Sequence, residues 1–378
     1  MNRELAVKVA NAVLYEGYRL YPYRPSAMKN RQRWSFGILY PPAYHEVAAG
    51  TERSQMHSEC LVRVTGNPVL QVQLRFLHLV THEVAERAIE SRDEGVERSV
   101  EIEVPLSEIL NETSNQSSNE HVNQTWVPRS SRLLSGAGQV ASNARTAPPL
   151  RQAQGRLWPR DGQNGAPQVQ GFPFAASTET EPVRDNSGND VGEIRRTQQG
   201  ITGSIAVAAS QLRDDVVKLA LDVTNTSSLA DGSLNRDCAL LTSLLSAHTI
   251  LSITGGEFIS LLDPPDDLQQ EVSACRNVGN FPVLVGAEGE HDMMLCSPIV
   301  LYDYPQIAPE SAGDFFDGTE MDEMLTLRIM TLTDEEKNAM LTADDRVRNL
   351  LQRTEAGARE QLARTHGTIR SMRQVNES

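Results

Sequence analysis

The stretch LQVQLRFLHLV, residues 70–80, decides the fold class, because its side chains alternate between apolar and polar over most of its length. One face of an extended chain would carry Leu70, Val72, Leu74, Phe76, His78 and Val80, and the other Gln71, Gln73 and Arg75. A period of two is typical of a β-strand with one buried face. The stretch therefore predicts a strand whose apolar face belongs to the core.

Further strands are expected on both sides of this stretch. Runs at 34–40, 60–64 and 100–104 are typical of short strands, and Gly66-Asn67-Pro68 predicts a turn. At least four short strands thus precede residue 110, with no long helix between them. This order favours an antiparallel sheet over alternating strands and helices.

The same pattern returns after residue 200. Strands are expected at 205–209, 217–223, 249–261, 283–285 and 299–302. Lys218 and Asp222 would face outward from the second of these strands, and Gly255-Gly256 would form the turn of a hairpin. We therefore predict a mainly β protein with some α-helix and an antiparallel, β-sandwich-like body.

Helices and a polar insertion complete the predicted organisation. Residues 5–18 carry two apolar ridges at helical spacing, which predicts an N-terminal helix. Ser, Asn, Gln, Gly and Pro dominate 111–200, which predicts a long disordered insertion. Thr333 and Glu336 form a capping box that opens a C-terminal helical extension. The predicted parts are 1–110, the N-terminal helix and first β part; 111–200, the insertion; 201–312, the second β part; and 313–378, the helical extension.

The C-terminal extension is divided by charge. Acidic residues crowd the region before Glu336, and arginines follow it at positions 346, 348, 353, 359, 364 and 370. An apolar stripe at helical spacing runs through the basic part: Val347, Leu351, Ala358 and Leu362. This order suits the helix dipole and a solvated face, with a partner-binding face as the alternative.

Composition narrows the classes of partner and the compartment. The formal net charge of -15 argues against binding to nucleic acid or to an anionic membrane, because both require clustered Lys and Arg. No uncharged apolar run is long enough to span a bilayer, and the N-terminus lacks the apolar core of a signal peptide. Four cysteines without a CxxC pair fit thiols in a reducing compartment. We therefore expect a cytoplasmic protein without a membrane span.

Candidate metal ligands are few. Cys275, His291 and Cys296, with Asp292 nearby, are the only soft ligands that gather in one region, and their spacing matches no zinc or iron–sulfur motif. His78 and His82 would share the face of a helix, but a strand places them about 13 Å apart. The acidic residues at 314–323 lack the glycine position of a calcium loop. Buried thiols and helix-capping carboxylates are the alternative interpretations.

No complete catalytic or cofactor motif occurs in the chain. It contains no GxGxxG, GxxxxGK followed by Ser or Thr, or GxSxG sequence, so the usual signals for dinucleotide binding, P-loop chemistry and α/β-hydrolases are missing. A catalytic triad assembled from distant residues stays open, since triads are recognised by geometry. We predict no cofactor, leave a metal site open, and favour a protein that is not an enzyme.

Three strings of sequence carry a resemblance to a protein family: FPVLVG at 281–286, SPIVLYDYPQIAPES at 297–311 and LRIMTLTDEEK at 327–337. They resemble a family of uncharacterised bacterial proteins encoded alongside uptake NiFe hydrogenases. The resemblance implies an accessory or assembly role and supplies no established catalytic residues. The cysteines form none of the paired CxxC motifs by which a hydrogenase large subunit holds nickel and iron, so this chain would not be that subunit.

The expected function is that of a non-catalytic accessory or assembly protein that binds another protein, with hydrogenase subunits or maturation factors as partners. The expected contact surface is Tyr302-Asp303-Tyr304-Pro305, because aromatic anchors rimmed by charge suit interfaces. Alternatively, the two tyrosines pack the end of a strand. Two other functions stay open: a permanent structural subunit of a larger assembly, and a metal-dependent enzyme using Cys275, His291, Asp292 and Cys296.

Overall fold

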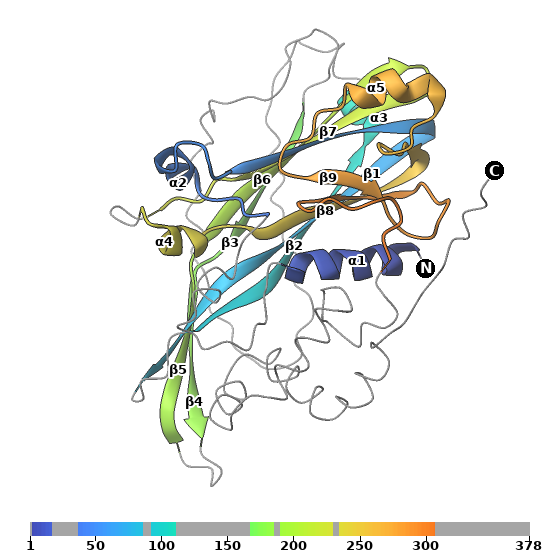
Figure 1. The fold of residues 1–378 in the computed structure, drawn as a ribbon. Coiled ribbons are helices and arrows are strands. Elements are labelled where there is room, and N and C mark those ends of the chain that lie inside the picture. Colours follow the sequence, from blue (N-terminus) through green and yellow to red (C-terminus); the bar gives the residue numbers. More distant parts are fainter. Residues whose placement is uncertain are drawn as a thin grey trace, which may run out of the picture.

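The computed structural model describes six ranges of the chain. They are residues 2–16, 37–85, 92–110, 167–184, 190–229 and 234–306. Within them the protein is mainly antiparallel β-sheet with a helix at its N-terminal end, which confirms the predicted fold class (Figure 1).

Short helices and long strands make up the described ranges. The helical elements are α1 (Asn2–Glu16), α2 (Pro42–Val47), α3 (Leu106–Leu110), α4 (Arg236–Leu240), the 3-10 turn η3 (Asp266–Leu268) and α5 (Gln269–Ser273). The strands are β1 (Gln55–Ala85), β2 (Arg92–Pro105), β3 (Gln168–Phe174), β4 (Ser177–Arg184), β5 (Asp190–Gln198), β6 (Ile201–Arg213), β7 (Val216–Asn225), β8 (Leu245–Phe258), β9 (Phe281–Leu284) and β10 (Met293–Ser297). None of the described helices has the length and apolar character needed to cross a membrane.

All ten described strands belong to one antiparallel sheet organised around β1. The main order is β3-β6-β7-β1-β8-β10-β9; β2 and β5 also pair with β1, and β4 pairs with β5. Residues 55–63 of β1 pair with β7, whereas 69–82 pair with β2. β8 follows β1 from residue 62 to residue 77. The chain segments before residue 110 and after residue 200 therefore form a single sheet.

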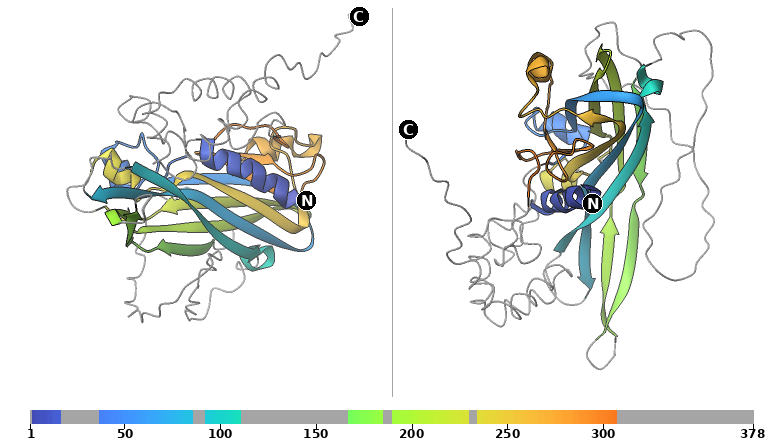
Figure 2. Two further views of the ribbon diagram at one scale, coloured as in Figure 1. Left: turned by 90° about the horizontal axis from the view of Figure 1, so that it is seen from below. Right: turned by 90° about the vertical axis from the view of Figure 1, so that its right-hand side faces the viewer.

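The sheet folds over on itself into two leaves. One leaf contains β3, β6 and β7, and the other contains β2, the later part of β1, β8, β10 and β9 (Figure 2). Both inner faces contribute to one apolar core, which includes Leu74 and Phe76 of β1, Val207 of β6 and Leu219 of β7. The rings of Phe76 and Phe172 lie 6.2 Å apart in this core. The body is thus sandwich-like, with the apolar face of the opening stretch inside.

Two predicted turns do not form, because each lies inside a continuous strand. β1 runs through Gly66-Asn67-Pro68, and β8 runs through Gly255-Gly256. The register shifts here: Val64 lies opposite Gly256 and Val69 opposite Thr254, so four residues of β1 face one residue of β8. The turn-forming residues are used for a bulge that bends both strands, and a local sequence pattern does not distinguish this from two hairpins.

Gly255 is the point of closest approach at this bulge. Its φ is +74°, and a Cβ atom there would lie 2.9 Å from the carbonyl oxygen of Thr65 and 3.3 Å from that of Asn67. Gly66 on the other strand also has a positive φ, +67°, but a Cβ there would meet nothing within 4 Å. Both glycines adopt a left-handed conformation, and only Gly255 is also required by close packing.

α1 covers the outer face of the leaf that contains β8, β9 and β10 (Figures 1 and 2). Its residues Ala6, Ala10 and Val13 are buried in a cluster with Ile250 of β8 and Leu295 of β10. The apolar ridges expected for residues 5–18 face the sheet from Ala6 to Leu14, whereas Leu5 is exposed and residues 17–18 lie outside the described ranges. α1 closes the side of the sandwich opposite the main core.

Part of the predicted insertion, 111–200, is ordered as strands. β3, β4 and β5 all lie within it. β3 pairs with β6, and β5 pairs with both β4 and residues 80–85 of β1. β3 contributes Phe172 to the core, whereas the described side chains of β4 and β5 are mostly polar, so the alternation that identifies a half-buried strand is weak there. Residues 111–166 lie outside the described ranges.

Two further predicted strands and the predicted C-terminal helices lie near the ends of the described ranges or beyond them. The strand expected at 34–40 is reduced to Leu39, which forms an isolated bridge with Leu244, and its first residues lie outside. Residues 299–302 lie beside β9 without joining the sheet. The helical extension at 313–378, with the acidic residues 314–323, lies wholly outside the described residues.

Candidate functional site

The four predicted metal ligands lie in different surroundings. Cys296 is buried in the core between the two leaves, whereas Cys275 packs in a separate cluster with α5. The Nδ1 atom of His291 lies 3.0 Å from the carbonyl oxygen of Phe258. The backbone carbonyl of Asp292 accepts a hydrogen bond of 3.0 Å from β8. These positions do not bring the four side chains together as one site.

Burial keeps both thiols in the protonated form. Burial raises the pKa of Cys275 to about 11 and that of Cys296 to about 11. Cysteine binds metals as the thiolate, and both thiols stay protonated near neutral pH. Among the described residues, no group of three or more His, Cys, Asp or Glu side chains is arranged to hold a metal ion.

His78 and His82 lie on β1, as the strand pattern predicts. Burial, followed by the charge of Arg98, lowers the pKa of His78 to about 4, so this imidazole is neutral. The Nε2 atom of His82 lies 3.0 Å from an oxygen of Glu94 on β2. The two histidines therefore have separate surroundings.

The predicted partner-binding loop, Tyr302-Asp303-Tyr304-Pro305, lies along the outer edge of β9, and its side chains differ in exposure. Tyr302 is 67% exposed, and the nearby Val300 is 73% exposed. Ile299 and Leu301 turn the other way and pack against the cluster under α1. Exposed and packed apolar side chains alternate along this segment.

Asp303 anchors the loop. Its Oδ1 atom accepts a hydrogen bond of 2.8 Å from the N–H of Leu284, and its Oδ2 atom accepts one of 2.5 Å from the hydroxyl of Ser260. The same hydroxyl oxygen accepts from the N–H groups of Leu262 and Asp263, at 3.1 and 2.8 Å. One carboxylate thus joins the loop to the end of β9 and to the segment that follows β8.

Tyr304 is a packing residue. Its N–H donates to the carbonyl oxygen of Leu284 at 2.8 Å, and its hydroxyl donates to that of Glu290 at 2.9 Å. Its φ is +54°, which is uncommon for a residue other than glycine. Its ring is partly buried against the main core. Of the two tyrosines, Tyr304 therefore packs against the body, and Tyr302 is exposed.

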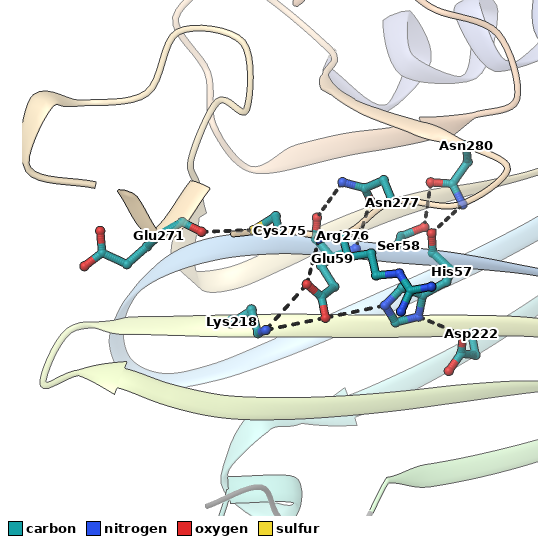
Figure 3. Close-up of polar contacts among 10 residues, drawn as sticks. All are labelled: His57, Ser58, Glu59, Lys218, Asp222, Glu271, Cys275, Arg276, Asn277 and Asn280. Atoms are coloured by element: carbon teal, nitrogen blue, oxygen red, sulfur yellow. Dashed lines mark hydrogen bonds and ion pairs between the residues drawn. The ribbon is translucent and has the colours of Figure 1, made fainter. Parts of the chain in front are cut away.

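A second group of polar side chains lies on the outer face of β1 and β7, with three members buried and Lys218 half-buried (Figure 3). We call His57, Glu59, Lys218 and Asp222 the histidine–carboxylate cluster. His57 Nδ1 lies 2.8 Å from Asp222 Oδ1, and His57 Nε2 lies 3.4 Å from Glu59 Oε1. Lys218 Nζ lies 3.4 Å from the same oxygen of Glu59. All four side chains can therefore interact as one unit.

The register of the β1–β7 ladder brings these side chains together. His57 lies directly opposite Asp222, and the period of two places Glu59 on the same face of β1 as His57. Met56 and Cys60 point to the opposite face, into the core between the leaves. The alternation that directs the apolar side chains into the core therefore also places these polar side chains on the outer face.

The segment that follows α5 covers this outer face. The N–H of Arg276 donates to Glu59 Oε2 at 2.8 Å. The side chain of Asn277 accepts from the N–H of Glu59 at 2.9 Å and donates to its carbonyl oxygen at 3.3 Å. Val278 and His57 exchange two backbone hydrogen bonds, of 3.0 and 2.8 Å. At this edge of β1, Asn277 therefore makes the backbone hydrogen bonds that a neighbouring strand would otherwise make (Figure 3).

His57 is an imidazolium in this cluster. Burial by itself lowers its pKa, but the hydrogen bonds to Asp222 and Glu59, together with their charges, outweigh burial and raise the pKa to about 9. Burial also opposes the charge on Glu59, but hydrogen bonds from His57 and from the N–H of Arg276, with the charge of Lys218, lower its pKa. A protonated imidazole is not a general base at neutral pH. The cluster is suited to hold the covering segment on the sheet.

We expect the free energy of unfolding to fall as the pH rises from about 6.5 to about 9. The pKa of His57 is raised in the folded protein, so its contribution is fully present below the unfolded value of 6.5 and is lost above about 9. The loss is roughly 3–4 kcal/mol at most, since the pKa differs by about 2.5 units and one unit corresponds to about 1.4 kcal/mol. Urea unfolding at several pH values measures it. A His57→Gln variant with the same slope over this window would contradict the assignment.

The sequence contains a partial signal for the cluster. Lys218 and Asp222 were expected on the outer face of their strand, and they lie there. His57 and Glu59 are spaced two residues apart immediately before the strand expected at 60–64. The covering residue Asn277 is 218 residues away from Glu59 in the chain. Nothing local therefore indicates that this polar face is buried.

Comparison with known proteins adds no family to this description. No family model matches the chain. A search of curated proteins likewise found no match. A functional assignment therefore depends on the geometry of the loop at 300–305 and of the histidine–carboxylate cluster.

Proposed function

We propose that this chain is a non-catalytic accessory or assembly protein that binds another protein through Leu262, Val300 and Tyr302, which we call the 262–302 surface. One observation carries the proposal: these apolar side chains are 58, 73 and 67% exposed, while the neighbouring Asp303 ties their backbone segments to one another. Large apolar side chains are thus exposed on backbone segments that hydrogen bonds hold in place.

Such an arrangement suits protein binding for two reasons. Covering apolar surface stabilises a complex by about 25 cal/mol per Å² before the costs of association are subtracted. A tied backbone loses little conformational entropy on binding, which reduces those costs. Tyrosine is also enriched among the residues that dominate interface energies. We therefore assign Tyr302 as the main anchor of the surface.

The proposed partners are hydrogenase subunits or maturation factors in the cytoplasm. This part of the proposal depends on the resemblance carried by 281–286, 297–311 and 327–337. The first of these strings contains β9, and the second contains Val300 and Tyr302. The net charge of -15 makes nucleic acid an unsuitable partner.

Two alternatives make different predictions. A metal-dependent enzyme would use Cys275, His291, Asp292 and Cys296, and would contain stoichiometric metal after purification. The separate surroundings of these side chains do not favour it. A permanent structural subunit could use the same 262–302 surface, but its complex would survive dilution, whereas an accessory protein would exchange.

The proposal is tested by purifying the tagged chain gently from its own host and identifying the accompanying proteins by mass spectrometry. We expect hydrogenase subunits or maturation factors, and about 30-fold weaker association with Tyr302→Ser, which corresponds to about 2 kcal/mol for a hot-spot aromatic. Val169→Ser is the matched control, because Val169 is 57% exposed on β3, away from the surface. Urea unfolding should change by less than about 0.5 kcal/mol in both variants.

Two outcomes would overturn the proposal. Purification of the chain without any partner would contradict the proposal. Metal analysis of the same sample would then test the enzyme alternative. Equal capture of the same partner by Tyr302→Ser and by the original chain would show that the 262–302 surface is not the contact.

A further inference from the structure

We propose that the 262–302 surface is covered, in the absence of a partner, by the basic segment 346–373 of the same chain. This inference rests on the proposed function, because it concerns the regulation of the same surface. It gives the arginine-rich segment a specific position and makes partner binding a competition with the chain itself.

Acidic residues occur in the segments that carry the exposed apolar residues and in the segments hydrogen-bonded to them. The hydrogen bonds of Asp303 and Ser260 bring Leu262 and Asp263 beside the loop. The hydroxyl of Tyr304 donates to the carbonyl oxygen of Glu290, so the segment around Glu290 also lies beside the loop. The segments 257–263, 288–292 and 300–304 are therefore neighbours, as the backbone hydrogen bond of 2.7 Å from Phe258 to His291 also shows.

The charge of these neighbouring segments is entirely of one sign apart from His291. They contain no Lys or Arg, and their carboxylates include Glu257, Asp263, Glu288, Glu290 and Asp303. The charges of Asp303, Glu288 and Glu290 also contribute to the raised pKa of Tyr304, after burial. Elsewhere on the described surface, some acidic groups lie beside arginine side chains: Arg213 lies 3.2 Å from Asp267. A partner for the 262–302 surface should therefore be basic and carry apolar side chains.

The segment 346–373 has this chemistry. It contains seven arginines and two glutamates, a formal charge of 7 − 2 = +5. Its apolar positions, Val347, Leu351, Ala358 and Leu362, follow a helical spacing, so apolar and cationic groups can face the same surface. Arginine suits such a contact because its guanidinium pairs with carboxylates and also stacks on aromatic rings such as Tyr302.

The segment can reach the surface from where the described chain ends. Residue 306 lies two residues beyond Tyr304, and Arg346 lies 346 − 306 = 40 positions further along the chain. Forty residues span up to about 130 Å when extended, so length does not limit the contact. Attachment to the same chain gives an effective concentration of about millimolar. This favours the chain's own segment over a second copy of the protein.

The acidic residues that precede Glu336 could compete for the same arginines. The 262–302 surface offers apolar contact and carboxylates together, which suits a segment with both apolar and cationic side chains. Contact through both kinds of group predicts that high salt weakens the association without abolishing it, since screening acts on the charges alone.

The test is photo-crosslinking in the full chain, with Tyr302 replaced by p-benzoylphenylalanine. At low protein concentration and about 50 mM salt, we expect crosslinks from position 302 to residues within 346–373. The control replaces Val169, which is similarly exposed, by the same photoreactive residue, and should give no such crosslinks. Changing all seven arginines of the segment to Gln should lower the yield from position 302 by about fivefold or more. Mixing isotopically labelled and unlabelled chains identifies crosslinks between molecules.

Each result decides the inference. Crosslinks within one molecule to 346–373, lost in the arginine variant, support it. Crosslinks to 307–336 only, crosslinks between differently labelled molecules, or a yield unchanged by the arginine substitutions would overturn it. If Tyr302→Ser loses the co-purifying partner while no crosslink forms to 346–373, only this inference fails. If the crosslinks form but the partner is unaffected by Tyr302→Ser, the proposed function fails instead.

Discussion

Replacing His57 by Ala should lower the free energy of unfolding by about 3–5 kcal/mol, a large part of the roughly 5–15 kcal/mol typical of folded domains. Two buried carboxylates, Glu59 and Asp222, share the charge of this imidazolium. Removing it leaves Asp222 without its cross-strand partner, and leaves Glu59 with the half-buried Lys218 and the N–H of Arg276. Breaking a buried ion pair from one side costs more than the pair itself contributes, because the remaining charge stays desolvated. Urea unfolding near pH 6.5 measures the change.

A second substitution separates charge from packing in this cluster. In the His57→Ala background, Asp222→Asn removes the stranded charge and should recover about 1–2 kcal/mol. His82→Ala is the matched control for losing a histidine beside a carboxylate on β1. The His82–Glu94 pair is more exposed, at 18 and 35% for the two side chains, so this control should lose less than about 1 kcal/mol. Equal losses for His57→Ala and His82→Ala would show that the cluster contributes no special stability.

Replacing Gly255 by Ala should lower the free energy of unfolding by about 2–4 kcal/mol. A left-handed φ costs an alanine about 1–2 kcal/mol, and forcing atoms into a packed site adds about 1–3 kcal/mol. Both costs apply here, because φ is +74° and the new Cβ would lie 2.9 Å from the carbonyl oxygen of Thr65. The neighbouring groups are backbone atoms of β1, which cannot turn aside as a flexible side chain could. Urea or thermal unfolding measures the loss.

Gly66→Ala is the matched control on the other side of the bulge. Its φ of +67° carries the same conformational cost, but a Cβ there has open space around it. We expect a loss of about 1–2 kcal/mol, from the backbone conformation alone. The difference between the two variants measures the close approach of β1 and β8. A Gly66→Ala loss as large as that of Gly255→Ala would mean that packing at the bulge is loose.

The strands show which features of the fold a local sequence pattern predicts and which it does not. Alternation in residues 70–76 and 217–223 correctly predicts both the strands and the faces that enter the core, because burial of one face imposes a period of two. Gly66-Asn67-Pro68 and Gly255-Gly256 were interpreted as turns and instead form a bulge between paired strands. β4 and β5 carry few apolar side chains and pair with their neighbours, so no apolar pattern predicts them, whereas β3 also contributes Phe172 to the core.

For the candidate sites too, the sequence predicted some features and only the tertiary structure decided others. The loop at 302–305 was identified from its aromatic and acidic residues, but the sequence treated Tyr302 and Tyr304 alike. The tertiary structure separates them, since hydrogen bonds to Leu284 and Glu290 hold Tyr304 in place. The gathering of Cys275, His291, Asp292 and Cys296 in sequence was not matched in space, because adjacent residues of the chain enter different layers of the body.

The sequence by itself determined the mainly antiparallel β class, the N-terminal helix and its buried ridge, because these depend on the local period of apolar side chains. Only the tertiary structure decided that one 31-residue strand, β1, pairs with four others and that His57 is buried between Asp222 and Glu59. These features depend on contacts between residues as far apart as Glu59 and Asn277. Such contacts arise from register and layer packing, for which the residues nearby in the chain carry no pattern.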